Sequence, residues 1–156
     1  MQPIMEIRIT NPMNLFCFTA ETTLVELMQY VRVKPHELYC AAANAGLEVV
    51  GPQYWIYSGS NGNPGTRFTL QIGIPVHDAD GRVADFATVA CPAIECAVMV
   101  HEGTWAELPA TYGKLIAEVI ASGRSLSGVT REVYLHIDFD NPANCRTEIQ
   151  LGLLPK

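Results

Sequence analysis

The chain has 156 residues and a formal net charge of −6; hydrophobic residues make up 49% of it and charged residues 17%. This composition predicts a single globular domain over residues 1–156, and it excludes a disordered or collagen-like chain. Because the basic residues are scattered along the sequence, direct binding to nucleic acid is not expected.

The distribution of apolar residues argues against a membrane or secreted protein. The longest uncharged stretches, such as 51–66, contain Gly, Pro, Ser and Asn, so none can form a spanning helix. Residues 1–10 place Glu6 and Arg8 inside an alternating apolar run and lack the basic start and apolar core of a secretion signal. We therefore expect a cytoplasmic protein with no membrane partner.

The two halves of the sequence resemble each other. Three landmarks recur with one constant shift along the chain: Gly46, Gly51 and Tyr57 correspond to Gly123, Gly128 and Tyr134. Further on, RFTLQIGI at 67–74 corresponds to RTEIQLGL at 146–153. This ordered series of matches indicates an internal duplication, with one repeat over about 1–78 and the other over about 79–156.

The first repeat begins with a β-rich run over 5–18. Thr23 and Glu26 have the spacing of a capping box, which predicts the start of a helical region. A proline inside a helix removes a hydrogen bond, so the main helix is expected to begin near Pro35. Glycine readily adopts the left-handed backbone conformation that often ends a helix, so we expect this helix to stop at Gly46.

The second repeat follows a turn at 78–81 and has the same order. A β-rich run over 83–101 precedes another capping-box signature at 104–107. By the same arguments, its helix is expected to extend from near Pro109 to Gly123.

Each helix is followed by two runs in which apolar and polar residues alternate, as in half-buried strands. These runs are 54–57 and 68–74 in the first repeat, and 131–137 and 147–153 in the second. Turn-forming residues between the members of each pair predict two hairpins. The repeated unit is therefore βαββ, and the fold class is α+β with antiparallel sheets.

The alternation assigns a face to each side chain of the strand 131–137. The aliphatic residues Val133, Leu135 and Ile137 lie on one face, and Glu132, Tyr134 and His136 lie on the other. The strands 68–74 and 147–153 likewise have one aliphatic face. We expect all of these aliphatic faces to pack against the helices.

The polar and aromatic faces then remain for a ligand. If the repeats are related by a pseudo-two-fold axis, their sheets enclose a central cleft lined by Trp55, Tyr57, Glu132, Tyr134, His136 and Glu148. Gly73 and Gly152 are expected to leave space at its floor. A carboxylate among aromatic rings favours an amphipathic organic cation or acid–base chemistry.

Structural roles for the same residues stay open at this point. Glu132 could form a buried ion pair with Arg131 or Arg146, and the aromatic residues could be packing residues of the strands. The five cysteines form no CxxC pair and are expected to be buried thiols. The four histidines lack metal-ligand spacing, so neither a metal nor a cofactor is expected.

Three segments carry a resemblance that spans nearly the whole chain. They are GVTREVYLHIDFDNPANCRTEIQLGLL, then GPQYWIY followed by FTLQIGIPV, and VHEGTW before the second helix. Together they resemble the GyrI-like family, which includes the effector-binding domains of AraC-type and multidrug-sensing bacterial regulators. The resemblance implies duplicated βαββ modules that enclose a ligand pocket between the two halves.

The resemblance also implies roles for individual residues. The family's central pocket glutamate falls on Glu132 through the EVY motif, and a second acidic position falls on Glu148 through the TEI motif. Trp105 stands in HEGTW where the family often has proline and tyrosine, and it is expected to shape the pocket mouth. These assignments favour a stand-alone domain that binds small aromatic or lipophilic, often cationic, compounds.

Two other functions are compatible with the resemblance. Some stand-alone members resemble hydrolases of strained, cyclopropane-type electrophiles that use a glutamate and a tyrosine. Here Glu132 would be the base or nucleophile and Tyr134 the first candidate for the tyrosine, with Tyr57 and Tyr112 as alternatives. The remaining possibility is a protein partner, with the domain acting as an inhibitor of DNA gyrase.

Overall fold

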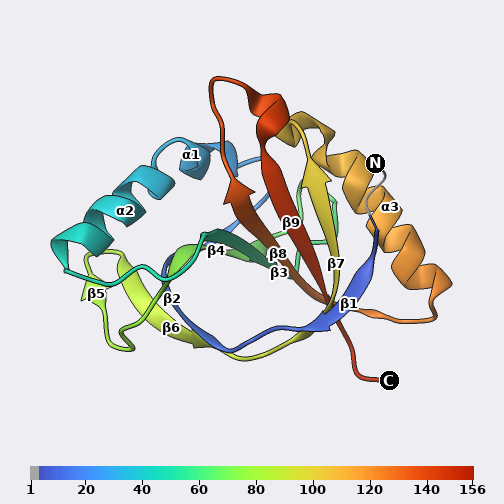
Figure 1. Ribbon diagram of the computed structural model, residues 1–156, viewed down its shortest axis with the longest axis horizontal. Coiled ribbons are helices and arrows are strands. Elements are labelled where there is room, and N and C mark those ends of the chain that lie inside the picture. The colour runs from blue at the N-terminus through green and yellow to red at the C-terminus, as the bar shows by residue number, and fades with distance from the viewer. Residues whose placement is uncertain (1–3) are drawn as a thin grey trace.

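The computed structural model describes residues 4–156 and shows an α+β fold with one nine-stranded antiparallel sheet and three α-helices (Figure 1). Residues 1–3, the beginning of the segment in which no secretion signal is expected, lie outside the described residues. Within 4–156, no helix has the length and apolar character needed to cross a membrane.

The strands of the two predicted hairpins are present, but the runs expected over 5–18 and 83–101 each divide into two strands, and a short further strand precedes the second of them. They are β1 (Glu6–Ile9), β2 (Met13–Thr22), β3 (Gln53–Ser58), β4 (Phe68–Val76), β5 (Arg82–Val83), β6 (Phe86–Cys91), β7 (Glu95–Glu102), β8 (Leu126–His136) and β9 (Arg146–Leu153). The helical segments are α1 (Met28–Val31), α2 (Lys34–Asn44), α3 (Leu108–Ala121) and the short 3-10 turns η1 (Trp105–Glu107) and η2 (Pro142–Asn144). The order in the sheet is β1-β7-β9-β8-β3-β4-β2-β6-β5.

The strand order relates the two halves of the chain. Outward from the contact between β3 and β8, the series is β3, β4, β2 on one side and β8, β9, β7 on the other. The edge strands exchange between halves, because β1 pairs with β7 and β6 pairs with β2. Since β3 pairs directly with β8, the two halves share one sheet, where the sequence predicted more than one.

The first helical region follows the signals in the sequence. The Glu26 backbone N–H donates a hydrogen bond to the Thr23 hydroxyl at 3.2 Å, and this turn leads into α1. The main helix α2 begins one residue before Pro35. It stops before Gly46, whose φ of +68° lies in the left-handed region that favours glycine. The prediction of a split helix is confirmed.

The second helix begins one residue before Pro109, as expected, but its start is held differently. The predicted capping bond from the Thr104 side chain is not formed. Instead, His101 Nε2 donates a hydrogen bond to the Thr104 carbonyl oxygen at 2.8 Å, and His101 Nδ1 lies 2.7 Å from the Thr111 hydroxyl. This buried histidine of β7 therefore ties the start of α3 to the sheet.

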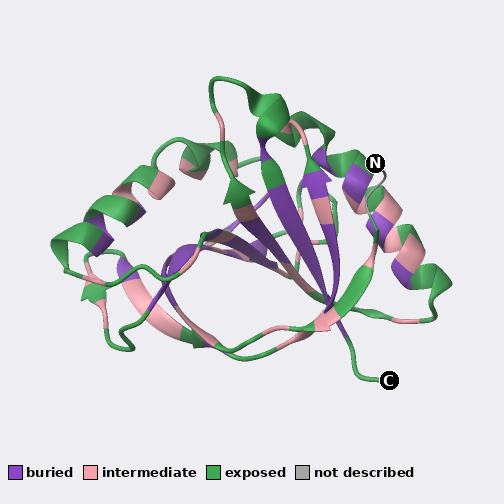
Figure 2. Ribbon diagram, in the orientation of Figure 1, coloured by how far each residue is buried: buried purple, intermediate pink, exposed green. Residues whose placement is uncertain are grey.

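We call the face of the sheet that carries α2 and α3 the helix face. Helix α2 packs mainly on β2 and β4, whereas α3 packs mainly on β7, so the central strands β3 and β8 run between the two helices (Figure 1). The cluster beneath α2 includes Phe16, Leu38, Ala42, Leu70, Ile72 and Ile74. The cluster beneath α3 includes Met99, Leu115, Val119, Ile149, Leu151 and Leu153. Figure 2 shows the central strands buried and the outer helix surfaces exposed. The aliphatic faces predicted for 68–74 and 147–153 are confirmed.

The predicted orientation of β8 is wrong. Glu132 stands opposite Trp55 in the register of β3 and β8, and Trp55 belongs to the cluster beneath α2. Glu132 and Tyr134 therefore lie on the helix face, and Val133 is buried on the opposite face. The other aliphatic residues of that opposite face, Leu135 and Ile137, are largely exposed. At the centre of the sheet, aromatic rings lie on the helix face. They supply the apolar contact that aliphatic side chains were expected to supply.

We call the opposite face the inner face, because the sheet curls around it. Leu15 of β2 and Cys91 of β6 pack there with Ile56 of β3, which lies two to three strands away in the sheet. The β1–β2 and β6–β7 connections meet on this side, where the Thr10 N–H donates to the Ile94 carbonyl oxygen at 2.9 Å. This curling explains why Val133 is buried without a helix above it.

The cysteines are free thiols, and the expectation that they are buried is confirmed for four of them and wrong for Cys40. Four of them are buried and one is exposed: Cys17, Cys91, Cys96 and Cys145 are buried, and Cys40 is exposed on α2. Burial raises the pKa of Cys17 to about 11, and it also raises the pKa of Cys91 and of Cys96. These three thiols remain protonated at neutral pH and act as small apolar side chains.

The strand glycines do not form the floor of a cleft, contrary to the prediction. A Cβ atom added at Gly73 would lie 2.7 Å from the Cβ of Cys17 and 2.7 Å from the Cγ of Leu15. A Cβ atom added at Gly152 would lie 2.4 Å from the Ser127 hydroxyl oxygen. Neighbouring side chains already fill the space above both glycines, so glycine is required here for close packing on the inner face.

We expect Gly73→Ala to lower the free energy of unfolding by about 1–3 kcal/mol, because the new methyl group overpacks the inner face. Gly113→Ala is the matched control, since this position in α3 has open space around it, and it should raise stability by about 0.5–1 kcal/mol. Chemical denaturation of both variants measures the difference. Equal midpoints for Gly73→Ala and wild type would contradict the packing role.

Candidate functional site

A buried carboxylate on β8 is surrounded by three tyrosine hydroxyls. Glu132 is 8% exposed. Its Oε1 accepts hydrogen bonds from Tyr134 at 2.6 Å and from Tyr57 at 3.3 Å, and its Oε2 accepts one from Tyr112 at 2.5 Å. We call these four residues the tyrosine–glutamate cluster.

The three tyrosines come from three different elements. Tyr134 lies two residues beyond Glu132 on β8, so both side chains leave the strand on the helix face. Tyr57 lies on the neighbouring strand β3, two residues from the position directly opposite Glu132. Tyr112 lies in the second turn of α3 and reaches across to the central strands. The cluster therefore joins both halves of the sheet to α3.

The charge of Glu132 has no cationic partner among residues 4–156. None of the ion pairs in the described chain includes Glu132. The possible partners considered from the sequence lie elsewhere, since Arg146 pairs with Glu102 and Arg131 is on the inner face. The buried carboxylate is therefore held by neutral hydrogen-bond donors.

The carboxylate and the apolar surroundings raise the pKa values of the three tyrosine hydroxyls. Burial raises the pKa values of Tyr57, Tyr112 and Tyr134 well above the usual value of 10, and the adjacent Glu132 charge raises them further. Each phenolate would lie next to an existing negative charge in a poorly solvated place. The tyrosines are therefore protonated donors throughout the physiological pH range.

Aromatic rings form the walls around this cluster. The Trp55 and Tyr134 rings meet edge to face with centroids 6.3 Å apart, and Trp105 meets Tyr134 in the same way at 5.8 Å. Trp105 also contacts Phe139 at 6.1 Å. Trp55 is buried, whereas Trp105 is 37% exposed and Phe139 is 80% exposed. Trp105 and Phe139 thus form the rim of the site on the solvent side.

The structure brings together five of the residues that the sequence singled out, namely Trp55, Tyr57, Trp105, Glu132 and Tyr134. It does not place His136 there, because a register irregularity follows Tyr134 and His136 is exposed. Glu148 is also separate, since it pairs with Val133 and faces the inner side of the sheet. The expectation that Glu132 and Glu148 line one cleft is wrong.

From the sequence, Tyr112 was expected only as an alternative catalytic tyrosine and not as part of the ligand wall. Phe139 was missed altogether, and it follows the end of β8 in the loop before η2. The helical periodicity around Tyr112 was the available signal, because it lies one residue after the buried Thr111, beside the apolar stripe of α3. Its reach to Glu132 depends on how α3 crosses the sheet.

The chain is similar to known proteins over nearly its whole length. A family model described as the GyrI-like small molecule binding domain matches residues 5–154. No curated protein sequence matches the chain.

Solved structures share the fold at low sequence identity. The EcmrR C-terminal domain is 17% identical with a TM-score of 0.82, and the match covers 100% of both chains. In the EcmrR–DNA complex the identity and TM-score are the same, but this chain spans only 58% of the EcmrR chain and the match covers 99% of this one.

Two further solved structures share the fold. SAV2435 bound to tetraphenylphosphonium is 10% identical with a TM-score of 0.67, over 97% of this chain and 94% of that one. A hydrolase from Listeria innocua is 14% identical with a TM-score of 0.63, over 96% and 91% of the two chains. Both are similar to this chain in fold.

We expect a spectrophotometric titration of the phenols to show a group that ionises well above pH 10. Replacing Glu132 by Gln should lower the pKa values of Tyr57, Tyr112 and Tyr134, because a negative charge beside them is removed. The exposed Glu26→Gln substitution is the control and should leave the titration unchanged.

The same shifts affect stability at high pH. A folded-state pKa above 10 contributes stability that is fully present below pH 10 and is lost as the pH rises further. The free energy of unfolding should therefore fall more steeply above pH 10 in wild type than in Glu132→Gln. Identical titrations for the two proteins would show that the carboxylate does not act on these phenols.

Proposed function

Since the chain belongs to the GyrI-like family of small-molecule binding domains, we propose that it binds small aromatic or lipophilic organic cations with Glu132 as the counter-ion. The observation that carries the proposal is a buried carboxylate whose hydrogen-bond partners are all neutral. Three hydroxyl donors solvate the charge but leave it in place, so the site remains an attractive position for a desolvated cation.

The walls of the site favour a lipophilic cation over a metal or ammonium ion. Trp55, Tyr57 and Tyr134 present aromatic rings beside the carboxylate, and ring faces attract cations while their edges pack with apolar groups. Among residues 4–156, no group of three or more His, Cys, Asp or Glu side chains is arranged to hold a metal ion. Delocalised organic cations fit this chemistry.

A ligand would enter past Trp105 and Phe139. Both are solvent-exposed, and both lie in connections beside strand ends. Displacing Trp105 would break the hydrogen bond that its Nε1 donates to the Thr147 hydroxyl of β9 at 3.2 Å. Trp55 and Tyr57, by contrast, are buried in the cluster beneath α2 and form the fixed wall. Binding would exchange one or more tyrosine hydrogen bonds of Glu132 for contact with the cation.

Two further observations support the proposal. The symmetric strand order supports a duplicated βαββ domain, with the site at the contact between its halves. SAV2435, which has the same fold, has been solved with tetraphenylphosphonium, a lipophilic cation of the proposed kind. The EcmrR–DNA complex shows that this fold can also be part of a longer, DNA-bound protein.

The experiment is a calorimetric titration with tetraphenylphosphonium and with tetraphenylborate, which has nearly the same shape and the opposite charge. We expect the cation to bind and the anion not to bind. Glu132→Gln should weaken cation binding by at least ~10-fold, corresponding to about 1.4 kcal/mol or more. Glu26→Gln, at an exposed position outside the tyrosine–glutamate cluster, should bind like wild type. Equal affinity in Glu132→Gln, or equal binding of the two ions, would reject the proposal.

Hydrolysis of a strained ring is the second candidate, favoured by the direct hydrogen bond between Tyr134 and Glu132. Glu132 would take a proton from water as the water oxygen bonds to a ring carbon. The ring bond would break, and its electron pair would take the Tyr134 proton. The 2.6 Å hydrogen bond would then return the proton from Glu132 to Tyr134.

Mass spectrometry with a panel of cyclopropane-bearing electrophiles tests this candidate. Turnover should be lost in Glu132→Gln and reduced by roughly 100-fold in Tyr134→Phe, in line with the usual contribution of a general acid. Tyr57→Phe is the comparison, because its hydroxyl lies farther from the carboxylate, at 3.3 Å. Absence of turnover in wild type would leave binding as the function of the site.

A further inference from the structure

The inner face carries a buried cation of its own. Arg131 is 4% exposed, and among residues 4–156 it forms no ion pair with a carboxylate. Its Nε has no hydrogen-bond partner. Burial of a guanidinium without a counter-charge is unfavourable. A buried group of this kind needs an explanation, such as a bound ligand that supplies the missing charge or hydrogen-bond acceptor.

An unpaired acceptor lies directly across from this unpaired donor. Gln150 of β9 stands opposite Arg131 of β8, so both side chains lie on the inner face. Gln150 is 3% exposed and its Oε1 has no partner. The orientation of its amide is set by Nε2, which donates to Glu148 at 2.7 Å.

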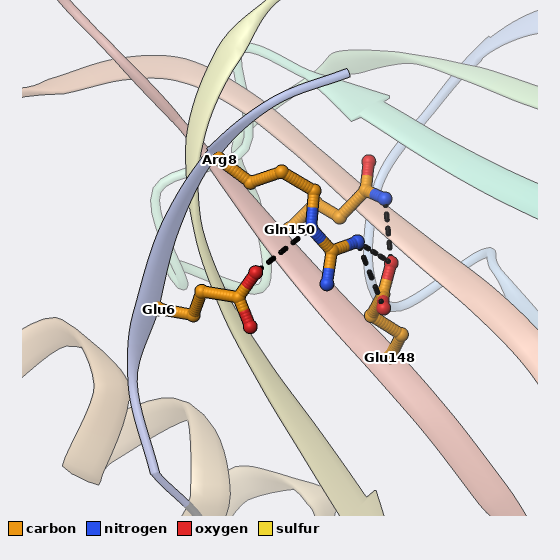
Figure 3. Close-up of polar contacts among 4 residues, drawn as sticks. All are labelled: Glu6, Arg8, Glu148 and Gln150. Carbon is orange, nitrogen blue, oxygen red and sulfur yellow. Dashed lines mark hydrogen bonds and ion pairs between the residues drawn. The ribbon is translucent and has the colours of Figure 1, made fainter. Parts of the chain in front are cut away.

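The nearest acidic group on this face is already engaged. The Arg8 guanidinium donates to both carboxylate oxygens of Glu148, at 3.2 and 3.3 Å, while Gln150 donates to one of them (Figure 3). Arg8 is held in turn by Glu6 of the same strand. Figure 3 shows Arg8 of β1 and Gln150 of β9 both reaching Glu148, while Glu6 contacts the Arg8 guanidinium. Glu148 is thus ion-paired with Arg8, and among residues 4–156 no ion pair joins a carboxylate to Arg131.

The surroundings of Arg131 are compatible with a bound anion. Arg131 acts on the pKa of Tyr54 and of Cys91 in the direction expected of a nearby positive charge, although burial raises both pKa values overall. Cys91 also lies in the wall of a surface groove of about 560 Å³, which includes Met13 and Pro92. The residues that line this groove do not include Arg131 or Gln150, so a ligand would have to pass Cys91 and its neighbours to reach them.

We propose that the inner face is a second ligand site, which takes a small carboxylate that also bears a hydroxyl group. The carboxylate would accept from the Arg131 guanidinium and neutralise it, and the hydroxyl would donate to Gln150 Oε1. A simple carboxylate satisfies only the first group, because it has no donor for the amide oxygen. Arg131 and Gln150 therefore favour a ligand that has both a negative charge and a hydrogen-bond donor.

This site is independent of the tyrosine–glutamate cluster. Arg131 and Glu132 are consecutive residues of one strand and point to opposite faces, so the two sites lie on either side of the central sheet. One would take a cation on the helix face and the other an anion on the inner face. The second proposal does not depend on the first.

Lactate and propionate test the proposal, because they share a carbon skeleton and differ by one hydroxyl group. Chemical-shift titrations of the full chain, at ionic strength held constant with chloride, measure both affinities. We expect lactate to bind roughly 5- to 10-fold more tightly than propionate, the effect of one hydrogen bond to a buried acceptor. Absence of lactate binding, or equal affinity for the two ions, overturns the proposal.

Two substitutions test whether the ligand binds at Arg131 and Gln150. Arg131→Met should abolish binding of both ions, and Gln150→Leu should remove the preference for lactate while propionate binding persists. Because a buried unpaired charge is removed, Arg131→Met should raise the thermal midpoint of the ligand-free protein, which also shows that it folds. Retention of lactate binding in Arg131→Met overturns the assignment. Tetraphenylphosphonium binding serves as the control readout and should be unchanged in both variants if the helix-face site acts as proposed.

Discussion

The structure depends on the burial of one carboxylate between neutral donors. Removing Glu132 from water costs free energy that three tyrosine hydroxyls offset, and each of them must reach the same group from a different element. These hydrogen bonds join β3, β8 and α3, whose positions are also held by the β3–β8 ladder and by the apolar packing beneath α3. Because the donors are neutral, no cation among residues 4–156 pairs with the carboxylate, and the proposed preference for cations rests on this group.

The central strands β3 and β8 carry different kinds of side chain on the two faces of the sheet. Side chains alternate along each strand, so consecutive residues of β8 face opposite sides. Glu132 lies among aromatic rings on the helix face, and Arg131 lies on the inner face among thiols and amides. Opposite charges at adjacent positions are thus kept apart by the sheet itself. The inner face also carries the Arg8–Glu148 ion pair, so both signs of charge occur there, whereas Glu132 on the helix face has no cationic partner among residues 4–156.

Periodicity in the sequence predicted the helices and hairpins well, because spacing and capping signals are local. The face of β8 was predicted wrongly, because aromatic residues such as Trp55 and Tyr134 pack against the helices where aliphatic residues were expected. The separation of Glu132 from Glu148 follows from a cross-strand register that alternation within one strand does not reveal. The reach of Tyr112 depends on helix placement, which is set by tertiary packing. The central glutamate itself was indicated by the resemblance to the family.

The most direct measurement is a crystal structure of the protein with tetraphenylphosphonium. If Glu132 is the counter-ion, the cation will lie against its carboxylate between the Trp55 and Tyr134 rings, with at least one tyrosine hydrogen bond to Glu132 replaced and Trp105 displaced from the rim. A cation bound elsewhere, with all three tyrosine hydroxyls still donating to Glu132, would contradict the account.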